Sequence, residues 1–217
     1  MNRPTAIQLA LAIPFLLAPG ACNIVAPIAI LVEGPPKFDE QYKLETDRPT
    51  VIFVDDQAGV LPRPALRQAM AEEAQKILLS EKTLTKVIDA KAAIQTSSAD
   101  KAGKMLSMVE VARAVDAEIM IYVSVDTFTL SPDRQSYSPV ASMRVKVLDV
   151  TKPQPRLWPA DRDGFPFEAS IRQKTTEIPK TRSEITIAEN DLAKQCGKAI
   201  AQLFFSHEVT GSAAKGR

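Results

Sequence analysis

The sequence has few of the residues from which enzymes build active sites. Its 217 residues include one histidine, His207, which follows the last predicted helix, and two cysteines. A Ser-His-Asp or Cys-His arrangement is hard to build around a single histidine in that place. Gly-rich phosphate loops, cysteine pairs and His-Glu helix motifs are also missing. The sequence therefore predicts a non-catalytic protein with no catalytic residue, no metal site and no cofactor.

The two cysteines, Cys22 and Cys196, lie far apart and in different contexts. Cys196 falls on the apolar stripe of a predicted helix, where it is interpreted as a small buried hydrophobe. A disulfide between the two is not expected. For His207 a metal or proton site is the alternative, and a solvated residue near a helix end is the favoured interpretation.

The sequence also lacks an excess of positively or negatively charged residues. Lys and Arg number 27 against 26 Asp and Glu, which gives a net charge of +1. No stretch is strongly basic, so the phosphate-neutralising contribution that dominates nucleic-acid affinity is absent and no nucleic-acid partner is predicted. With 45% apolar and 24% charged residues, the composition is that of an ordinary globular protein. About 170 residues remain after an apolar leader, enough for one domain.

The amino terminus has the pattern of a secretory leader. Arg3 is the first charge, and Ala6 to Ala18 is apolar apart from Gln8. Small residues then precede Cys22, which resembles a bacterial lipobox, although Pro19 occupies the position where a Leu-like residue is usual. A plain cleaved signal is one alternative. An uncleaved membrane anchor is another, because apolar character resumes from Ile24 to Val32.

These features predict a lipoprotein with residues 1–21 as signal peptide and Cys22 as the lipidation site, carrying a fatty acyl group of the palmitate type. Residues 22–49 are interpreted as the lipidated start and an extended tether, residues 50–207 as the domain, and residues 208–217 as a disordered tail. The protein would be anchored to a membrane of the cell envelope and face the periplasm. Which membrane holds it stays open.

The domain is predicted as α/β, a single three-layer-like unit. It has a mixed sheet of about five strands, with an antiparallel hairpin or meander, and three helices. Helical spacing marks residues 64–79, 105–115 and a final helix, for which Thr186 and Glu189 fit a capping box. Strand patterns mark residues 50–54, 85–88, 118–128, 142–150 and 165–171. Pro166 indicates that the last of these strands lies at an edge.

Three segments carry a family resemblance. They are the opening strand Val51 to Asp55, the run Val111 to Ile119 that enters a strand, and the strand Val145 to Val150. In this order of elements they resemble the curli-secretion lipoproteins, the penicillin-binding-protein activator lipoproteins and the TolB amino-terminal domain. The resemblance implies an envelope accessory module that binds an unidentified envelope protein. The alternative is an oligomeric secretion or assembly component like the curli-secretion family. The oligomeric state stays open.

Two sets of residues are candidates for a site. Trp158, Phe165 and Phe167 form an aromatic group beside prolines, which is typical of a contact surface for a partner. The alternative is that these rings cover one face of the sheet. Asp55 and Asp56 follow the first strand, where a metal could bind, but a turn-forming pair is the favoured interpretation.

Overall fold

The computed structural model describes residues 37–98, 106–172 and 178–208. Cys22, the predicted signal peptide and residues 209–217 of the predicted tail lie outside the described residues. The helices are α2 (Ala65–Ser80), α3 (Ala90–Ser98), α4 (Met108–Ala114) and α5 (Arg182–Gln202). The strands are β1 (Lys37–Phe38), β2 (Thr50–Asp55), β3 (Val87–Ile88), β4 (Ile119–Thr129), β5 (Val140–Asp149), β6 (Arg156–Trp158), β7 (Phe165–Ser170) and β8 (His207–Glu208).

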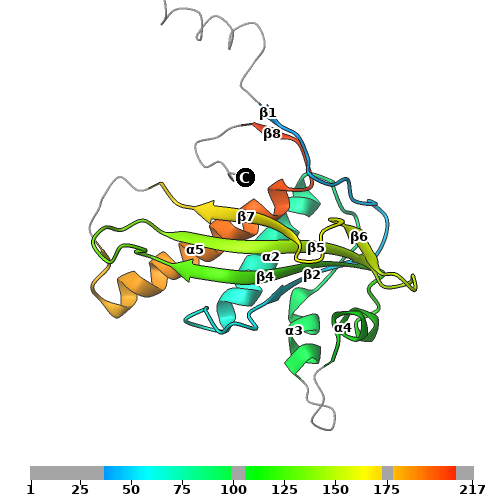
Figure 1. The fold of residues 1–217 in the computed structure, drawn as a ribbon, viewed down its shortest axis with the longest axis horizontal. Coiled ribbons are helices and arrows are strands. Elements are labelled where there is room, and N and C mark those ends of the chain that lie inside the picture. The colour runs from blue at the N-terminus through cyan, green and yellow to red at the C-terminus, as the bar shows by residue number, and fades with distance from the viewer. Residues whose placement is uncertain (1–36, 99–105, 173–177, 209–217) are drawn as a thin grey trace, which may run out of the picture. The chain divides into compact units, whose positions relative to one another are not determined.

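A mixed sheet forms the centre of the domain (Figure 1). Its strand order is β3-β2-β4-β5-β6, and β7 also pairs with β5. β2 runs parallel to β3 and β4, whereas β4 and β5 form the predicted antiparallel hairpin. β6 and β7 follow each other along the far side of β5. The predicted α/β class with a mixed sheet is confirmed.

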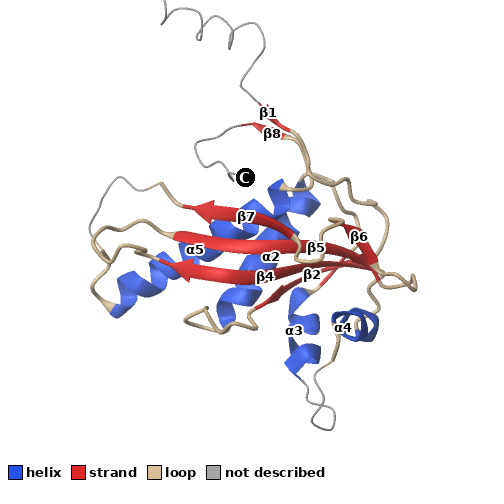
Figure 2. Ribbon diagram, viewed as in Figure 1, coloured by secondary structure: helices blue, strands red, loops and turns tan. Residues whose placement is uncertain are grey.

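Helices cover both faces of this sheet, so the domain has three layers (Figure 2). β4 alternates between the two sides, as its two-residue period requires. Ile119, Ile121 and Val123 face the larger core under α2 and α5. Met120 and Tyr122 face a second, smaller core under α3 and α4. Both faces of this part of the strand are therefore covered.

Four helices rather than three are present in the described residues, and this corrects the sequence prediction. The added helix, α3, lies between the predicted strand 85–88 and the predicted helix 105–115, in a stretch with many polar residues. Its buried residues, Ala90 and Ala93, are small, which left its apolar signal weak. The sheet likewise has six strands rather than about five. The added one, β6, lies within a proline-rich segment that was interpreted as a connection.

The start of α5 is also corrected. The predicted capping box at Thr186 and Glu189 is wrong, because the helix begins five residues earlier, at Arg182. Thr181 and Glu184 form the box instead: Glu184 N–H donates to Thr181 Oγ1 at 3.2 Å, and Thr181 N–H donates to Glu184 at 3.0 Å. Both pairs match the same spacing, so the sequence could not separate them.

The two threonines of these boxes offer a matched test. We expect Thr181→Ala to lower the free energy of unfolding by about 1 kcal/mol, because it removes the side chain that caps the helix. Thr186→Ala should change stability by less than about 0.5 kcal/mol, since this residue lies inside α5 and alanine is the better helix former. Chemical denaturation of both variants measures the difference. Equal losses of unfolding free energy in the two variants would show that Thr181 does not cap the helix.

Residues 37–49, which the sequence assigned to the tether, contact the domain. Gln41 N–H donates to the Leu203 carbonyl oxygen at 2.8 Å, and Leu44 is buried in the larger core. β1 pairs with β8. Arg48 binds Asp149 at the end of β5. The ordered domain therefore includes residues that precede Thr50. None of the helices among the described residues has the length and apolar character needed to cross a membrane.

Candidate functional sites

The predicted aromatic group is brought together, but it faces inward. Trp158 lies 4.9 Å from Phe165, 5.8 Å from Tyr42 and 6.4 Å from Phe204 between ring centroids. Trp158 and Phe165 are half-buried against the larger core, and Phe167 is only 3% exposed. This placement corresponds to the alternative in which the rings cover one face of the sheet. In this structure Phe167 offers no surface to a partner.

Asp55 and Asp56 have local structural roles. Asp56 accepts hydrogen bonds from the backbone N–H groups of Val60 at 2.8 Å and Leu61 at 3.1 Å, which is the contact expected of a turn-forming aspartate. Asp55 accepts a hydrogen bond from the Tyr122 hydroxyl at 2.9 Å. Burial of Tyr122, together with the negative charge of Asp55, raises the pKa of that phenol.

A crevice of about 480 Å³ lies beside these two aspartates, at the carboxyl end of β2. Open α/β sheets often bind ligands at this place. Arg67 also lines it, but the guanidinium donates to the Val54 carbonyl oxygen at 2.8 Å and lies over the Phe53 ring at 5.4 Å. The described residues contain no group of three metal-ligating side chains, here or elsewhere. The charged groups of this crevice are thus already paired with the protein.

Among the described residues, no helix covers one face of one half of the sheet. The smaller core ends at Met120 and Tyr122 on β4 and at Leu148 on β5. Beyond these residues, on the same face of the sheet, the pairing of β4 with β5 and of β5 with β7 places polar side chains next to one another. We call this surface the open face; its residues are Ser124, Asp126, Thr127, Ser142, Arg144, Lys146, Pro166 and Glu168.

The open face carries both charges, and it borders an edge strand. Arg144 Nε donates to Asp126 Oδ2 at 2.9 Å, and Arg144 Nη1 lies 3.9 Å from Asp163 Oδ2. Within the described residues, β7 pairs with β5 on one side and with no strand on the other, which confirms its predicted edge position. Pro166 and Glu168 on this strand, an imino acid and a charge, are features that discourage indiscriminate strand pairing.

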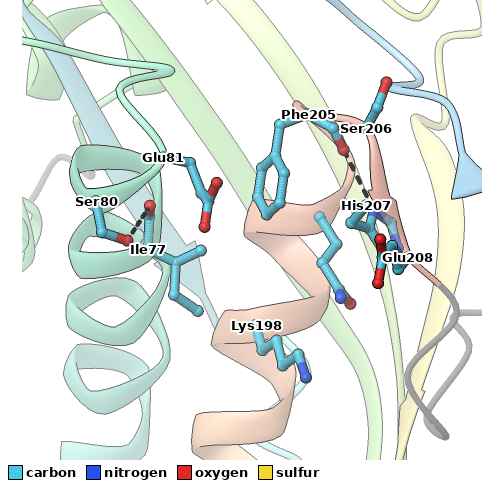
Figure 3. A pocket seen from close by; sticks show the side chains of 9 residues that line it. Ile77, Ser80, Glu81, Lys198, Phe205, Ser206, His207 and Glu208 are labelled. Atoms are coloured by element: carbon cyan, nitrogen blue, oxygen red, sulfur yellow. Dashed lines mark hydrogen bonds between the residues drawn. The ribbon is translucent and has the colours of Figure 1, made fainter.

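A second pocket, of about 440 Å³, lies where α2 and α5 end beside β8 (Figure 3). Ile77, Ser80 and Glu81 come from the end of α2, and Lys198, Gln202 and Phe205 come from α5 and its continuation; Ser206, His207 and Glu208 complete the lining. His207 is half-buried, with its ring 5.7 Å from Phe38 and 5.8 Å from Phe205. It is therefore packed between rings at the pocket, not simply solvated.

Gln202 is the unusual residue of this pocket. It is only 7% exposed, and its Oε1 accepts no hydrogen bond, alone among the buried side-chain oxygens and nitrogens of the described residues. A buried acceptor without a partner costs about 1–3 kcal/mol, so such groups are rare in folded proteins. No local pattern predicts this pocket, because its lining joins residues more than 100 positions apart in the sequence.

Comparisons with known proteins return structures only. Neither a family model nor a curated protein sequence matches the chain. A PelC dodecamer from Paraburkholderia phytofirmans is 12% identical with a TM-score of 0.41, and the match covers 77% of this chain and 94% of that chain. Lipoprotein GNA1162 from Neisseria meningitidis is 13% identical with a TM-score of 0.38, and the match covers 66% and 92%.

A third match is the LpoB C-terminal domain from Salmonella enterica. It is 13% identical with a TM-score of 0.34, and the match covers 60% of this chain and 86% of that chain. A lipoprotein is thus among the structures to which this chain is similar. None of these matches transfers the role of a residue to this chain.

Proposed function

We propose that this protein is a lipid-anchored lipoprotein of the cell envelope whose domain is a non-catalytic module that binds a protein partner. Cys22, after its apolar leader, is the proposed lipidation site. The domain would face the periplasm, and the partner would lie on the open face beside β7. The observation that carries the docking site combines two features of the part of the chain that the structure describes: a half-face that no helix covers, and an edge strand that pairs on one side only.

The chemistry of this surface supports a specific contact more than a strong apolar one. Its cations and carboxylates are interspersed, with Arg144 and Lys146 beside Asp126 and Glu168. Complementary charges across an interface select the partner and speed its association. An edge strand can also accept a strand from a partner, with main-chain hydrogen bonds supplying affinity. The aromatic group around Trp158 then acts as support beneath β6 and β7.

Site-specific photo-crosslinking in intact cells of the native host tests this proposal. A photoreactive benzoyl-phenylalanine is placed at position 168, on β7, or at position 76, where Lys76 is exposed on α2 over the opposite face. We expect a discrete adduct with a second envelope protein at position 168 only. The absence of an adduct there, or equal adducts at both positions, would contradict the proposed docking surface.

The mass of the adduct separates the proposal from its rival. An adduct of two copies of this chain, and of no other protein, would contradict partner binding and favour the oligomeric alternative. An adduct that joins this chain to a different protein would support the accessory module.

A further inference from the structure

We propose that the pocket at the ends of α2 and α5 binds a primary alkylammonium group. This inference is independent of the proposed partner, since the pocket lies at the helix ends and β8 and shares no residue with the open face. It is carried by four features of the pocket: an unpartnered acceptor, the ends of two helices, two carboxylates and an apolar wall.

The unpartnered acceptor is Gln202 Oε1. A hydrogen-bond donor from a ligand would supply the partner that the described residues do not provide. The last torsion of a glutamine side chain is broad, so the amide can turn its oxygen toward a donor in the pocket at little cost. A ligand with several N–H donors suits this position best, because the pocket offers further acceptors nearby.

The electrostatics of the pocket favour a cation. α2 ends at Ser80 and α5 ends at Gln202, and neither helix has a basic residue in its last turn. The carbonyl ends of helices carry a partial negative charge, which a cation offsets. Glu81 and Glu208 add two carboxylates, against one lysine ammonium from Lys198. The pocket therefore carries an excess of negative charge.

An organic cation fits better than a metal ion. The described residues provide no group of three metal-ligating side chains. Ile77 and Phe205 line the pocket as well, and they present apolar surface and an aromatic ring. The ring can accept the cation on its face, and the isoleucine can contact the methylene groups of a ligand. Together these residues match an ammonium head on a short alkyl stem.

Two sources of this chemistry can be distinguished. One is a free amine, for which putrescine is the probe, and the other is a lipid headgroup, for which glycerophosphoethanolamine is the probe. Each has a control with the same positive charge but no N–H donor on its cation: the bis(trimethylammonium) analogue of putrescine and glycerophosphocholine. If hydrogen bonding to the ammonium group contributes to binding, the pocket should prefer the amine in each pair.

Amide correlation spectra of the full-length protein, in micelles of an uncharged detergent, provide the measurement. The Gln202 side-chain amide signal, assigned by its loss in Gln202→Met, is expected to shift and saturate with putrescine, glycerophosphoethanolamine or both. Because one charge-assisted hydrogen bond is lost, each control should bind roughly tenfold more weakly or not at all. Saturation by only one probe identifies the source, and saturation by both shows that the pocket recognises the ammonium group that the two sources share.

Gln202→Met separates binding from folding. Methionine has a similar length and removes an acceptor that has no partner, so the variant should remain folded with a stability equal to or above that of the natural protein. The shifts of neighbouring backbone amides on adding putrescine should weaken by about tenfold or disappear. If neither amine probe shifts the natural protein, if the controls bind equally, or if folded Gln202→Met binds as well as before, the proposal is wrong.

Discussion

Replacing Arg48 with methionine is expected to lower the free energy of unfolding by about 3 kcal/mol, because the change leaves the exposed Lys152 ammonium, 3.1 Å away, as the one remaining cation that the structure describes beside a buried carboxylate. Arg48 donates to both carboxylate oxygens of Asp149, at 2.8 Å and 3.0 Å, and to Glu118 at 2.8 Å. Asp149 itself is 0% exposed. Arg48 thus fixes residues 37–49 to the ends of β4 and β5. Chemical denaturation of the two proteins measures the loss.

A matched control is Arg156→Met. Arg156 is exposed and donates to the Asp161 carbonyl oxygen at 3.1 Å, so its loss should cost less than about 1 kcal/mol. The double variant Arg48→Met with Asp149→Asn should regain part of the stability lost by Arg48→Met alone, since the buried negative charge that Arg48 neutralised is gone. Equal losses for Arg48→Met and Arg156→Met would show that the Arg48 contacts contribute little.

The same ion pair gives the stability a defined pH dependence. The Arg48 guanidinium holds the pKa of Asp149 below its ordinary value of 3.8. A group whose pKa is lower in the folded state contributes stability at pH values above its unfolded pKa, and this contribution is lost as the pH falls below that value toward the folded pKa. Stability should therefore fall as the solution is acidified below about pH 4, and this fall should be smaller in Arg48→Met, where only Thr151 and Lys152 among the described residues still contact the carboxylate.

Gly197→Val is the second substitution with a large expected effect, about 3 kcal/mol or more. α2 and α5 touch at this glycine. A Cβ atom there would lie 2.5 Å from the Met70 carbonyl oxygen and 2.7 Å from the Glu73 Cβ. Both are well inside van der Waals contact, and the first is a backbone atom, so the helices would have to move apart. Thermal and chemical denaturation measure the effect.

Lys194→Val is the control for this substitution. Lys194 is exposed on the same helix, so valine there pays only its lower helix propensity, about 0.5 kcal/mol. The difference between the two variants isolates the cost of separating α2 from α5. A Gly197→Val protein as stable as Lys194→Val would mean that the helices pack less closely than described.

The parts of the fold that the sequence predicted are those with a strong local pattern. β4 alternates from Ile119 to Val125, where a bulge shifts its register with β5, and its pairing with β5 follows from the polar connection between the two strands. Cys196 was expected on a buried stripe, and it is fully buried, where burial raises the pKa of its thiol. In both cases one local period decides which side chains face the core, so a single sequence is sufficient.

The parts that the sequence missed depend on small residues or on distant partners. α3 buries alanines, whose apolar signal is weak, and Thr181 and Thr186 offer two equivalent capping boxes. Residues 37–49 contain few apolar side chains, and their position depends on Arg48 meeting a carboxylate 101 positions away. The pocket around Gln202 likewise arises from helix ends that no local pattern relates. Tertiary contacts decide each of these features.

Intact-mass analysis of the natural protein, purified from its native membrane beside a Cys22→Ala variant, tests lipid anchoring most directly. We predict a mature protein that begins at Cys22 and carries added acyl mass, and we predict that the variant lacks both the cleavage and the added mass. Such a result would establish the anchor on which the proposed envelope function depends. A full-length, unmodified mass for the natural protein would contradict it and would identify residues 6–32 as an uncleaved membrane anchor.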